Sequence, residues 1–159
     1  MKGEQKGKQE ISSIKTDENP IPVFNGGKSP LGYTNVSNRI GKVMISEGGS
    51  CGFVNYYSGK FWSGGHNYTL DENDDLDTFY LKSILESKQE KLYKLGVGSS
   101  LLNIQKHAIE NFIVEIPKFQ EQTVIGQFFH ILDEQITTQD LKLGQLKQLK
   151  TAYLQKMFV

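Results

Sequence analysis

The 159-residue sequence contains one cysteine, Cys51, and no long hydrophobic run. A single cysteine cannot form an internal disulfide or, by itself, a zinc site, so no covalent or metal cross-link stabilises the fold. No apolar stretch approaches the roughly 18 residues that span a membrane. The first ten residues alternate Lys, Glu, Gln and Gly and lack the apolar segment of a signal peptide. We therefore expect a cytoplasmic protein without membrane contact that depends on a packed core.

The sequence also lacks net charge, because 18 Lys and Arg residues balance 18 Asp and Glu residues. The charges are unevenly distributed, since residues 20–70 carry four basic residues and one acidic residue, whereas residues 71–77 carry five acidic residues. Phosphate binding depends on the local potential, so a neutral total is compatible with a nucleic-acid partner. It argues against strong, indiscriminate binding of nucleic acid.

Most catalytic motifs are absent as well. The sequence has no phosphate-binding glycine motif, no H-E-x-x-H, no cysteine pair with ligand spacing and no Asn/Asp-Pro-Pro-aromatic methyltransferase motif. Glu86-Ser87-Lys88 has the E-x-K form of a nuclease motif, but we interpret it as the polar face of a helix. Cys51 and His66 offer a nucleophile and a base, although a packed cysteine and a polar loop histidine are the more common explanation. We expect a non-catalytic chain without a metal or cofactor of its own.

Residues 20–70 have the composition of a small sheet with prominent loops. Short β-rich runs bounded by Gly, Asn or Ser occur at residues 21–24, 43–45, 53–57 and 68–70. Glycine pairs mark the loops at residues 25–30, 47–52 and 63–66. We expect Tyr57 and Phe61 in the core of this sheet.

Residues 76–92 have apolar positions at helical spacing, and Asp74 or Asp75 can cap the helix that this spacing predicts. A Gly-Ser loop at residues 96–100 ends the helix, and a short turn follows at residues 106–108. Residues 112–117 then have the composition of a final strand that a proline terminates. Together these elements predict an α+β fold, in which one or two helices pack on a small mixed sheet.

From residue 121 onward the sequence contains no proline and only two glycines, and its apolar residues recur with heptad spacing. The a positions are Phe129, Ile136, Leu143, Lys150 and Met157, and the d positions are Leu132, Gln139, Leu146 and Tyr153. Leu141, Leu149 and Leu154 lie outside this stripe and widen it. At about 1.5 Å per residue such a helix is longer than a small domain can cover. We therefore expect a long coiled-coil helix that contacts another chain.

Polar and aromatic residues gather in or beside the Gly-rich turns. Such side chains bind phosphates and base edges when loops on a rigid sheet place them in a groove. Loops that bind carbohydrate or protein have similar compositions, so the residues alone leave these alternatives open. The candidate DNA-contacting residues are Lys28, Ser29, Tyr33, Thr34, Asn35, Ser50, Asn55, Tyr56, Lys60, Trp62, His66 and Asn67.

Taken in order, these segments resemble the specificity subunits of type I restriction-modification systems. Residues 22–35 are similar to the family's proline-led strand and Gly-Tyr-Thr turn, and residues 48–66 resemble its central block. Residues 92–104 match the later Gly-Ser loop, which adds Ser99 and Ser100 to the candidate DNA contacts. Residues 113–125 match the strand, proline and Glu-Gln pair that open the conserved helix. The resemblance extends from Pro20 to the C-terminus, whereas the first 19 residues do not resemble the family's opening strand.

The resemblance implies a DNA target-recognition domain at residues 1–119 and a helical region at residues 120–159. Within that domain, the balanced charges of residues 1–19 and their lack of apolar periodicity predict a peripheral or poorly ordered segment. The resemblance also implies a non-catalytic subunit that reads a half-site in double-stranded DNA. Partner modification subunits would carry S-adenosylmethionine and the methyltransferase chemistry, and a restriction subunit would cut unmodified DNA. The alternative is a truncated specificity fragment that acts only as a helical scaffold and does not recognise DNA.

Full-length members of the family carry two recognition domains separated by two helices in an antiparallel coiled coil. One domain and one helix therefore imply a homodimer, or pairing with a modification subunit. A two-fold dimer further implies a split, palindromic DNA target. The residues expected to make the helical contact are Phe129, Leu132, Ile136, Leu143, Leu146, Tyr153 and Met157.

Overall fold

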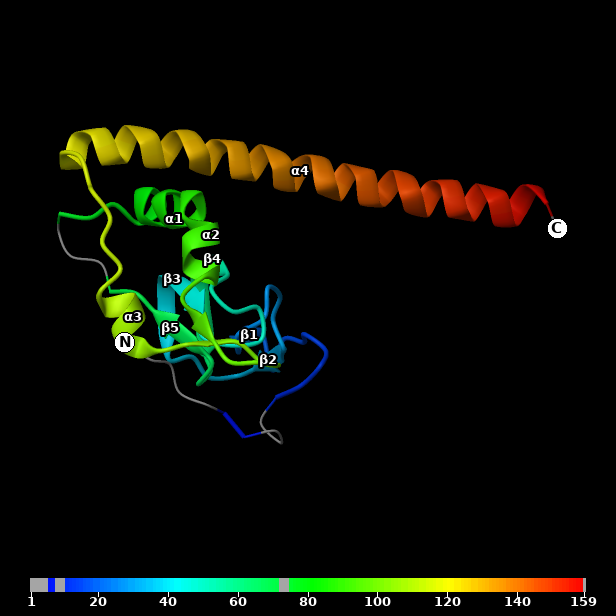
Figure 1. Cartoon of the computed structure of the whole chain (residues 1–159). Helices are drawn as coiled ribbons and strands as arrows, with labels where there is room; N and C mark the ends of the chain where they lie inside the picture. Colours follow the sequence, from blue (N-terminus) through cyan, green and yellow to red (C-terminus); the bar gives the residue numbers. More distant parts are fainter. Residues whose placement is uncertain (1–5, 8–10, 72–74, 159) are drawn as a thin grey trace.

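The computed structural model describes residues 6–7, 11–71 and 75–158. A small mixed sheet is covered by short helices, and one long helix extends far beyond the domain (Figure 1). This architecture confirms the predicted α+β class. The strands of the main sheet are β1 (Ile21–Phe24), β2 (Gly32–Thr34), β3 (Arg39–Ser46), β4 (Val54–Ser63) and β5 (Asn67–Thr69).

The main sheet has the strand order β2-β1-β4-β3-β5 and is mixed, because β1 runs parallel to β4 while the other pairs are antiparallel. The long strand β4 pairs with β3 over most of its length and with β1 at its end, through Trp62 and Ser63. The pairing of β3 with β4 shifts register between Ile40 and Lys42. The intervening Gly41 has φ 55°, which an L side chain rarely adopts.

The core occupies both faces of the sheet, because successive residues of a strand point to opposite sides. Val43 and Ile45 of β3 join the larger cluster, which also holds Leu81, Leu85 and Leu92 from the helices. Met44, between them, faces the other way and packs in a smaller cluster with Phe24 and Phe61. Tyr57 is partly buried against that smaller cluster. The predicted core positions of Tyr57 and Phe61 are therefore confirmed.

The four β-rich runs predicted from sequence overlap β1, β3, β4 and β5. Strand β2 was expected to be a turn. The final strand predicted at residues 112–117 is wrong, because this segment forms no strand. Its alternating pattern has another cause. Phe112 packs against the larger core cluster and Val114 borders it, whereas Ile113 is 89% exposed.

The predicted amphipathic helix is interrupted at Lys88 and forms α1 (Thr78–Ser87) and α2 (Gln89–Tyr93). The side chain of Gln89 accepts from the backbone N–H of Val54 at 3.2 Å, which ties the start of α2 to β4. The capping residue is Asp77, whose Oδ1 accepts from the N–H of Tyr80 at 2.9 Å. The expected caps are therefore corrected: Asp75 precedes the observed cap, and Asp74 lies outside the described residues.

A small hairpin of β6 (Gly96–Val97) and β7 (Asn103–Ile104) follows α2, and the short helix α3 (Lys106–Glu110) replaces the expected turn. The last helix, α4 (Phe119–Met157), has 39 residues. Its first turns pack on α1, so that α1 lies between α4 and the sheet, and the remainder projects away from the domain (Figure 1). None of the described helices combines the length and apolar composition of a membrane span.

Candidate nucleic-acid interface

Four loops meet at one side of the sheet, and we call this surface the loop edge. Backbone hydrogen bonds join the loops directly: the N–H of Ser50 donates to the carbonyl of Gly26 at 2.8 Å, and the N–H of Glu47 donates to that of His66 at 2.8 Å. The carbonyl of Glu47 accepts from the N–H of Ile104 at 2.9 Å, which adds the hairpin. The loop edge consists of residues 25–31, 47–53, 64–66 and 98–102.

Asn67 holds the loop edge together from inside. Its Nδ2 donates to the carbonyl of Phe24 at 2.8 Å, and its Oδ1 accepts from the N–H of Gly26 at 2.9 Å. Both bonds are buried, and they connect β5 to the end of β1, two strands that are not neighbours in the sheet. Asn67 was predicted to contact DNA. Its amide is instead committed within the fold, because an unpaired amide at this buried position would be costly.

Glycine is required where the loops approach most closely. Gly26 has φ 82°, and a Cβ at this position would lie 2.5 Å from the carbonyl oxygen of Gly48. Gly49 has φ 69°, and a Cβ there would lie 3.0 Å from the carbonyl oxygen of Gly26. The glycine pairs seen in the sequence therefore bring two loops into backbone contact, beyond simply allowing each loop to turn.

Seven of the predicted DNA-contacting residues lie at the loop edge or directly beside it. Ser50 and Asn55 are half-buried and the others are exposed. The ammonium of Lys28 lies 5.2 Å from the centre of the Phe53 ring, and Asn55 Nδ2 donates to the carbonyl of Lys28 at 3.3 Å. The residues that the structure brings together here are Lys28, Ser29, Ser50, Asn55, His66, Ser99 and Ser100.

A shallow cavity of about 360 Å³ lies at the loop edge and includes residues that the sequence interpretation missed. Tyr93 from the end of α2 and Leu101 and Leu102 from the hairpin line it together with Lys28, Ser50 and Ser100. Leu101 is 77% exposed. In the sequence, the pair of leucines that follows Ser99 and Ser100 could have indicated that this part of the hairpin belongs to the loop edge.

Glu47 is the acidic residue of the loop edge, and its carboxylate is engaged with neighbouring side chains. The hydroxyl of Tyr68 lies 3.3 Å from Glu47 Oε1, and His66 Nδ1 lies 3.7 Å from Oε2. Burial, and then the charge of Glu47, raise the pKa of Tyr68 to about 12. The Tyr68 hydroxyl also donates to the carbonyl of Ile104 at 2.8 Å. The carboxylate is mostly buried beneath the surface on which Lys28 and His66 are exposed.

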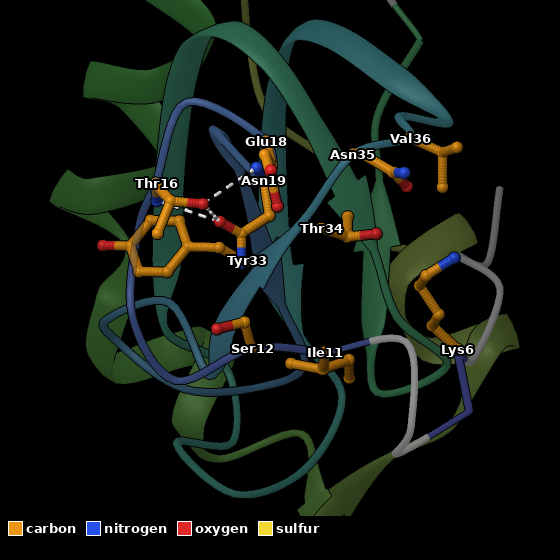
Figure 2. A pocket seen from close by; sticks show the side chains of 10 residues that line it. All are labelled: Lys6, Ile11, Ser12, Thr16, Glu18, Asn19, Tyr33, Thr34, Asn35 and Val36. Atoms are coloured by element: carbon orange, nitrogen blue, oxygen red, sulfur yellow. Dashed lines mark hydrogen bonds between the residues drawn. The ribbon is translucent and has the colours of Figure 1, made fainter.

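Tyr33, Thr34 and Asn35 lie on and after β2, beside the N-terminal segment and away from the loop edge. They line a cavity of about 670 Å³ with residues that include Lys6 and Ser12 (Figure 2). Tyr33 and Ser12 exchange backbone hydrogen bonds of 2.8 and 2.6 Å, so residues 11–19 begin with a bridge to β2. Thr34 is a correction to the predicted DNA contacts, because its side chain is buried.

Tyr56, Lys60 and Trp62 lie along β4 rather than in a loop. Tyr56 packs edge-on against Phe79 of α1 at 5.5 Å and lines a groove between β4 and α4. The ammonium of Lys6 lies 4.5 Å from the centre of the Trp62 ring. Lys60 is exposed. The structure therefore places these three residues outside the loop edge, and Tyr56 belongs to the surface between the domain and the long helix.

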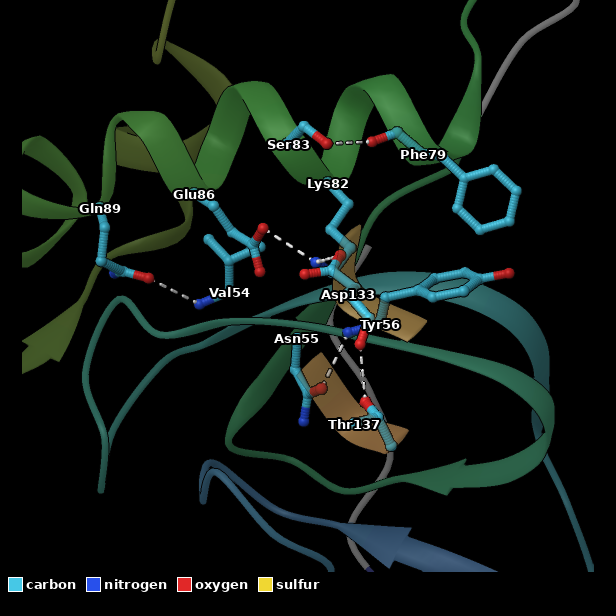
Figure 3. A network of polar contacts seen from close by, with 10 residues as sticks. All are labelled: Val54, Asn55, Tyr56, Phe79, Lys82, Ser83, Glu86, Gln89, Asp133 and Thr137. Carbon is cyan, nitrogen blue, oxygen red and sulfur yellow. Dashed lines mark hydrogen bonds and ion pairs between the residues drawn. The ribbon is translucent and has the colours of Figure 1, made fainter. Parts of the chain in front are cut away.

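The contact between α1 and α4 combines close backbone packing with polar bonds (Figure 3). Lys82 Nζ lies 2.7 Å from Asp133 Oδ2 and 2.9 Å from Glu86 Oε2. Burial opposes the charge of Lys82, but these hydrogen bonds outweigh it and raise the pKa of the ammonium. The rings of Phe79 and His130 stack at 3.9 Å. We call this set the α1–α4 contact.

Most of the apolar stripe of α4 lies on a different face from the α1–α4 contact, and only Ile136 of the stripe also lines the groove between β4 and α4. All seven residues predicted to contact a partner are exposed. Leu132 is the least exposed of them at 37%, and Met157 is the most exposed at 72%. Gln122 and Gly126, in contrast, are buried against the segment before α1 and its first turn. The helix thus uses one face for its own domain and leaves the predicted stripe available.

The surroundings of Cys51 and Glu86 disfavour the catalytic roles considered for them. Cys51 is buried, and desolvation raises the pKa of its thiol, which disfavours the nucleophilic thiolate. Glu86 of the E-x-K sequence is paired with Lys82. The described part of the chain contains no group of three or more His, Cys, Asp or Glu residues arranged to hold a metal ion.

Comparisons with known proteins agree with this architecture. The chain is 28% identical over 160 residues to a type I specificity subunit of Mycoplasma genitalium and 25% identical over 158 residues to one of Mycoplasma pneumoniae. Each alignment covers 97% of this chain, but only 41% and 42% of the relatives. The crystal structure of the type I restriction-modification S subunit from M. genitalium matches with a TM-score of 0.76 and 28% identity, covering 87% of this chain and 37% of that one.

The chain thus spans about two fifths of the length of the curated relatives that it matches. A family profile, described as the type I restriction modification DNA specificity domain, matches residues 3–148. The match begins well before Pro20, so the similarity to the family includes the N-terminal segment that bridges to β2. This profile, together with the relatives and the shared fold, shows that the chain belongs to the type I restriction modification DNA specificity domain family.

Proposed function

We propose that this chain recognises a half-site in double-stranded DNA through the loop edge. The observation that carries the proposal is the convergence of four loops, joined by backbone hydrogen bonds, in a member of a DNA specificity family. Loops that are already connected lose little conformational freedom when they bind, which favours tight and specific contacts. A rigid sheet that presents polar loops is a common arrangement for recognition.

Lys28 supplies an exposed ammonium for a DNA phosphate. Ser29, His66 and Ser100 supply exposed hydrogen-bonding groups that suit base edges. These side chains are short, so the loops themselves must enter a groove. Lys28 is the one Lys or Arg residue among the residues that define the loop edge, so phosphate contacts there are few, and selectivity for the target depends on the base contacts.

The exposed stripe of α4 supports self-association of two copies, which would place two recognition domains on one DNA molecule. A second apolar row, formed by Val124, Phe128 and Ile131 at helical spacing, is also exposed and lies outside the a and d positions. This row, near the domain, supports docking of a modification subunit. The assembly would therefore use separate faces of one helix for the second copy and for the modification subunit.

In this proposal the chain contributes specificity, and its partners contribute catalysis. The modification subunits carry S-adenosylmethionine and methylate DNA, and the restriction subunit cuts DNA that lacks the methyl mark. The chain itself needs no metal or cofactor, and the complex works in the cytoplasm.

Reconstitution with cognate modification subunits, followed by mapping of the methylated positions in a DNA library, tests this function. We expect methylation at a split, palindromic target. An unsplit target would contradict the two-copy arrangement. A complex that assembles on α4 yet selects no target would contradict DNA recognition and favour the helical scaffold.

A matched pair of lysine variants tests whether DNA binds at the loop edge. We expect Lys28→Gln to weaken binding and to reduce the slope of log affinity against log salt by about one per chain, because one phosphate contact is lost. Lys118→Gln, at the exposed start of α4, should leave the slope unchanged. Fluorescence anisotropy with a labelled duplex at several salt concentrations measures the slope for both variants. Equal slopes would contradict DNA binding at the loop edge.

A further inference from the structure

The apolar stripe of α4 is interrupted by two polar residues, Gln139 at a d position and Lys150 at an a position. Both are exposed. A polar residue within a coiled-coil stripe destabilises most pairings and is tolerated best opposite another polar group. The two positions therefore restrict how a second copy can pack.

A parallel arrangement places each stripe residue opposite the same residue of the partner. Lys150 would then face the partner's Lys150, and two ammonium groups would be brought together in a partly dehydrated interface. An antiparallel arrangement instead places a positions opposite d positions. The repulsion between the two lysines therefore favours the antiparallel direction.

We infer that two copies of α4 pair antiparallel in one register, with Gln139 opposite the partner's Lys150. This inference rests on the self-association proposed above and specifies its geometry. In this register the remaining layers are apolar throughout. They pair Leu132 with the partner's Met157, Ile136 with the partner's Tyr153, and Leu143 with the partner's Leu146.

Charges beside the stripe select the same register. The e positions flank an antiparallel interface, and here they place Asp140 beside the partner's Lys147 on both sides of the two-fold axis. Within the described residues neither Asp140 nor Lys147 forms an ion pair, and both are exposed. Both side chains are therefore available for an intermolecular pair.

The two neighbouring registers are disfavoured. A shift of one heptad toward the domain brings Asp140 opposite the partner's Asp140 and buries Lys150 against the partner's Leu132. A shift of one heptad away from the domain brings Lys147 opposite the partner's Lys147 and pairs Lys150 with the partner's Leu146. Each shift therefore brings like charges together at the centre of the interface and leaves Lys150 without a polar partner in the stripe. The first shift also brings Lys147 near the partner's Asp133, but that carboxylate is already paired with Lys82 of its own chain.

The inferred register places the two-fold axis between Gly144 and Gln145. At about 1.5 Å per residue, the two copies of Gly126, where the helices leave their domains, would lie roughly 55 Å apart. The helix of the partner ends at Met157, opposite Leu132, so Val124 and Phe128 lie outside the paired part of α4. The register thus leaves Val124 and Phe128 of the second apolar row open for a modification subunit.

Disulfide formation between two single-cysteine variants tests the register. Gln139→Cys and Lys150→Cys should each fail to cross-link alone, because two copies of either residue would lie about 16 Å apart. An equimolar mixture of the two should form a covalent dimer under mild oxidation. A mixture of Leu132→Cys and Lys150→Cys is the matched control for the neighbouring register and should not cross-link. The unmodified chain controls for Cys51, which is buried.

Sedimentation of the same samples separates the two ways in which the experiment can fail. A dimer in which either variant cross-links with itself, or in which the Leu132→Cys mixture cross-links, would overturn the register but leave self-association intact. A chain that stays monomeric would overturn both.

A charge exchange provides a second test that involves no cysteine. Asp140→Lys should raise the dimer dissociation constant about tenfold, because two attractive pairs become repulsive. Adding Lys147→Asp in the same chain should restore the original value, since each pair is then re-formed with reversed sign. A double variant that dimerises no better than Asp140→Lys alone would overturn the register.

Discussion

Lys82 of α1 and Asp133 of α4 form an ion pair of 2.7 Å that joins the domain to the long helix. The side chain of Lys82 is only 17% exposed and is also bonded to Glu86, so the ammonium is held between two carboxylates. Because α4 carries the surface for a second copy, the direction in which the helix leaves the domain sets where that copy lies. The pair therefore connects the stability of the domain to the geometry of the proposed assembly.

Removal of Asp133 should destabilise the chain measurably. We expect Asp133→Ala to lower the free energy of unfolding by about 1 kcal/mol, because Lys82 is mostly buried and loses one of its two partners. Glu110→Ala breaks an exposed pair with Lys106 and should cost less than about 0.5 kcal/mol. Urea denaturation measures the free energy of unfolding of both variants. Equal decreases would show that the Lys82–Asp133 pair stabilises the chain no more than an exposed ion pair does.

The two glycines of α4 should respond oppositely to alanine. A Cβ at Gly126 would lie 2.6 Å from the backbone nitrogen of Tyr80, so Gly126→Ala must push α4 away from α1 and should cost about 2 kcal/mol. A Cβ at Gly144 meets nothing within 4 Å, so Gly144→Ala should stabilise the helix by roughly 0.5–1 kcal/mol. Thermal unfolding followed by circular dichroism measures both changes, and a stabilising Gly126→Ala would contradict the close packing.

Asn67 should be important for folding, whereas Asn35 should not. Asn67→Ala removes two buried hydrogen bonds between β5 and the end of β1, and we expect a loss of about 2 kcal/mol together with weaker DNA binding. Asn35 is exposed after β2, so Asn35→Ala should change stability by less than about 0.5 kcal/mol. A stable Asn67→Ala chain with normal DNA affinity would contradict the role of Asn67 in the loop edge.

Tyr68 should make stability depend on pH in the alkaline range. Its pKa is raised from the ordinary value of 10.0 to about 12, so the folded chain retains the hydroxyl proton where the unfolded chain has lost it. The stabilisation is fully present below pH 10 and is lost as the pH rises from 10 to 12. Tyr68→Phe cannot titrate and should show a shallower decline, which denaturation at several pH values will detect. Parallel declines would place the titration elsewhere.

The sheet and its loops were largely predictable, because their signals are local. Strands β1, β3, β4 and β5 each follow from a run of β-branched or aromatic residues, and glycine pairs mark the loops between them. The exposed stripe of α4 was also predictable, since heptad spacing places its residues on one face whatever the helix packs against.

The errors arose where residues distant in sequence determine the outcome. Residues 112–117 have the composition of a strand. The segment nevertheless pairs with no strand, and its Phe112 packs against the larger core cluster. Thr34 and Asn67 have the composition of surface contacts, yet both are buried, and the role of Asn67 depends on carbonyl and N–H groups more than 40 positions away.

By itself the sequence determined the fold class, the loops and the long helix with an unpaired apolar stripe, because each depends on residue types at short, regular spacing. The tertiary structure decided which polar residues share a surface. It gathered Lys28, His66 and Ser100 at one edge and left Tyr33 and Tyr56 elsewhere. It also decided which face of α4 meets its own domain, through Gly126 and Asp133. These outcomes depend on the strand order and on the packing of α1 between the sheet and α4, which bring together atoms that no local pattern relates.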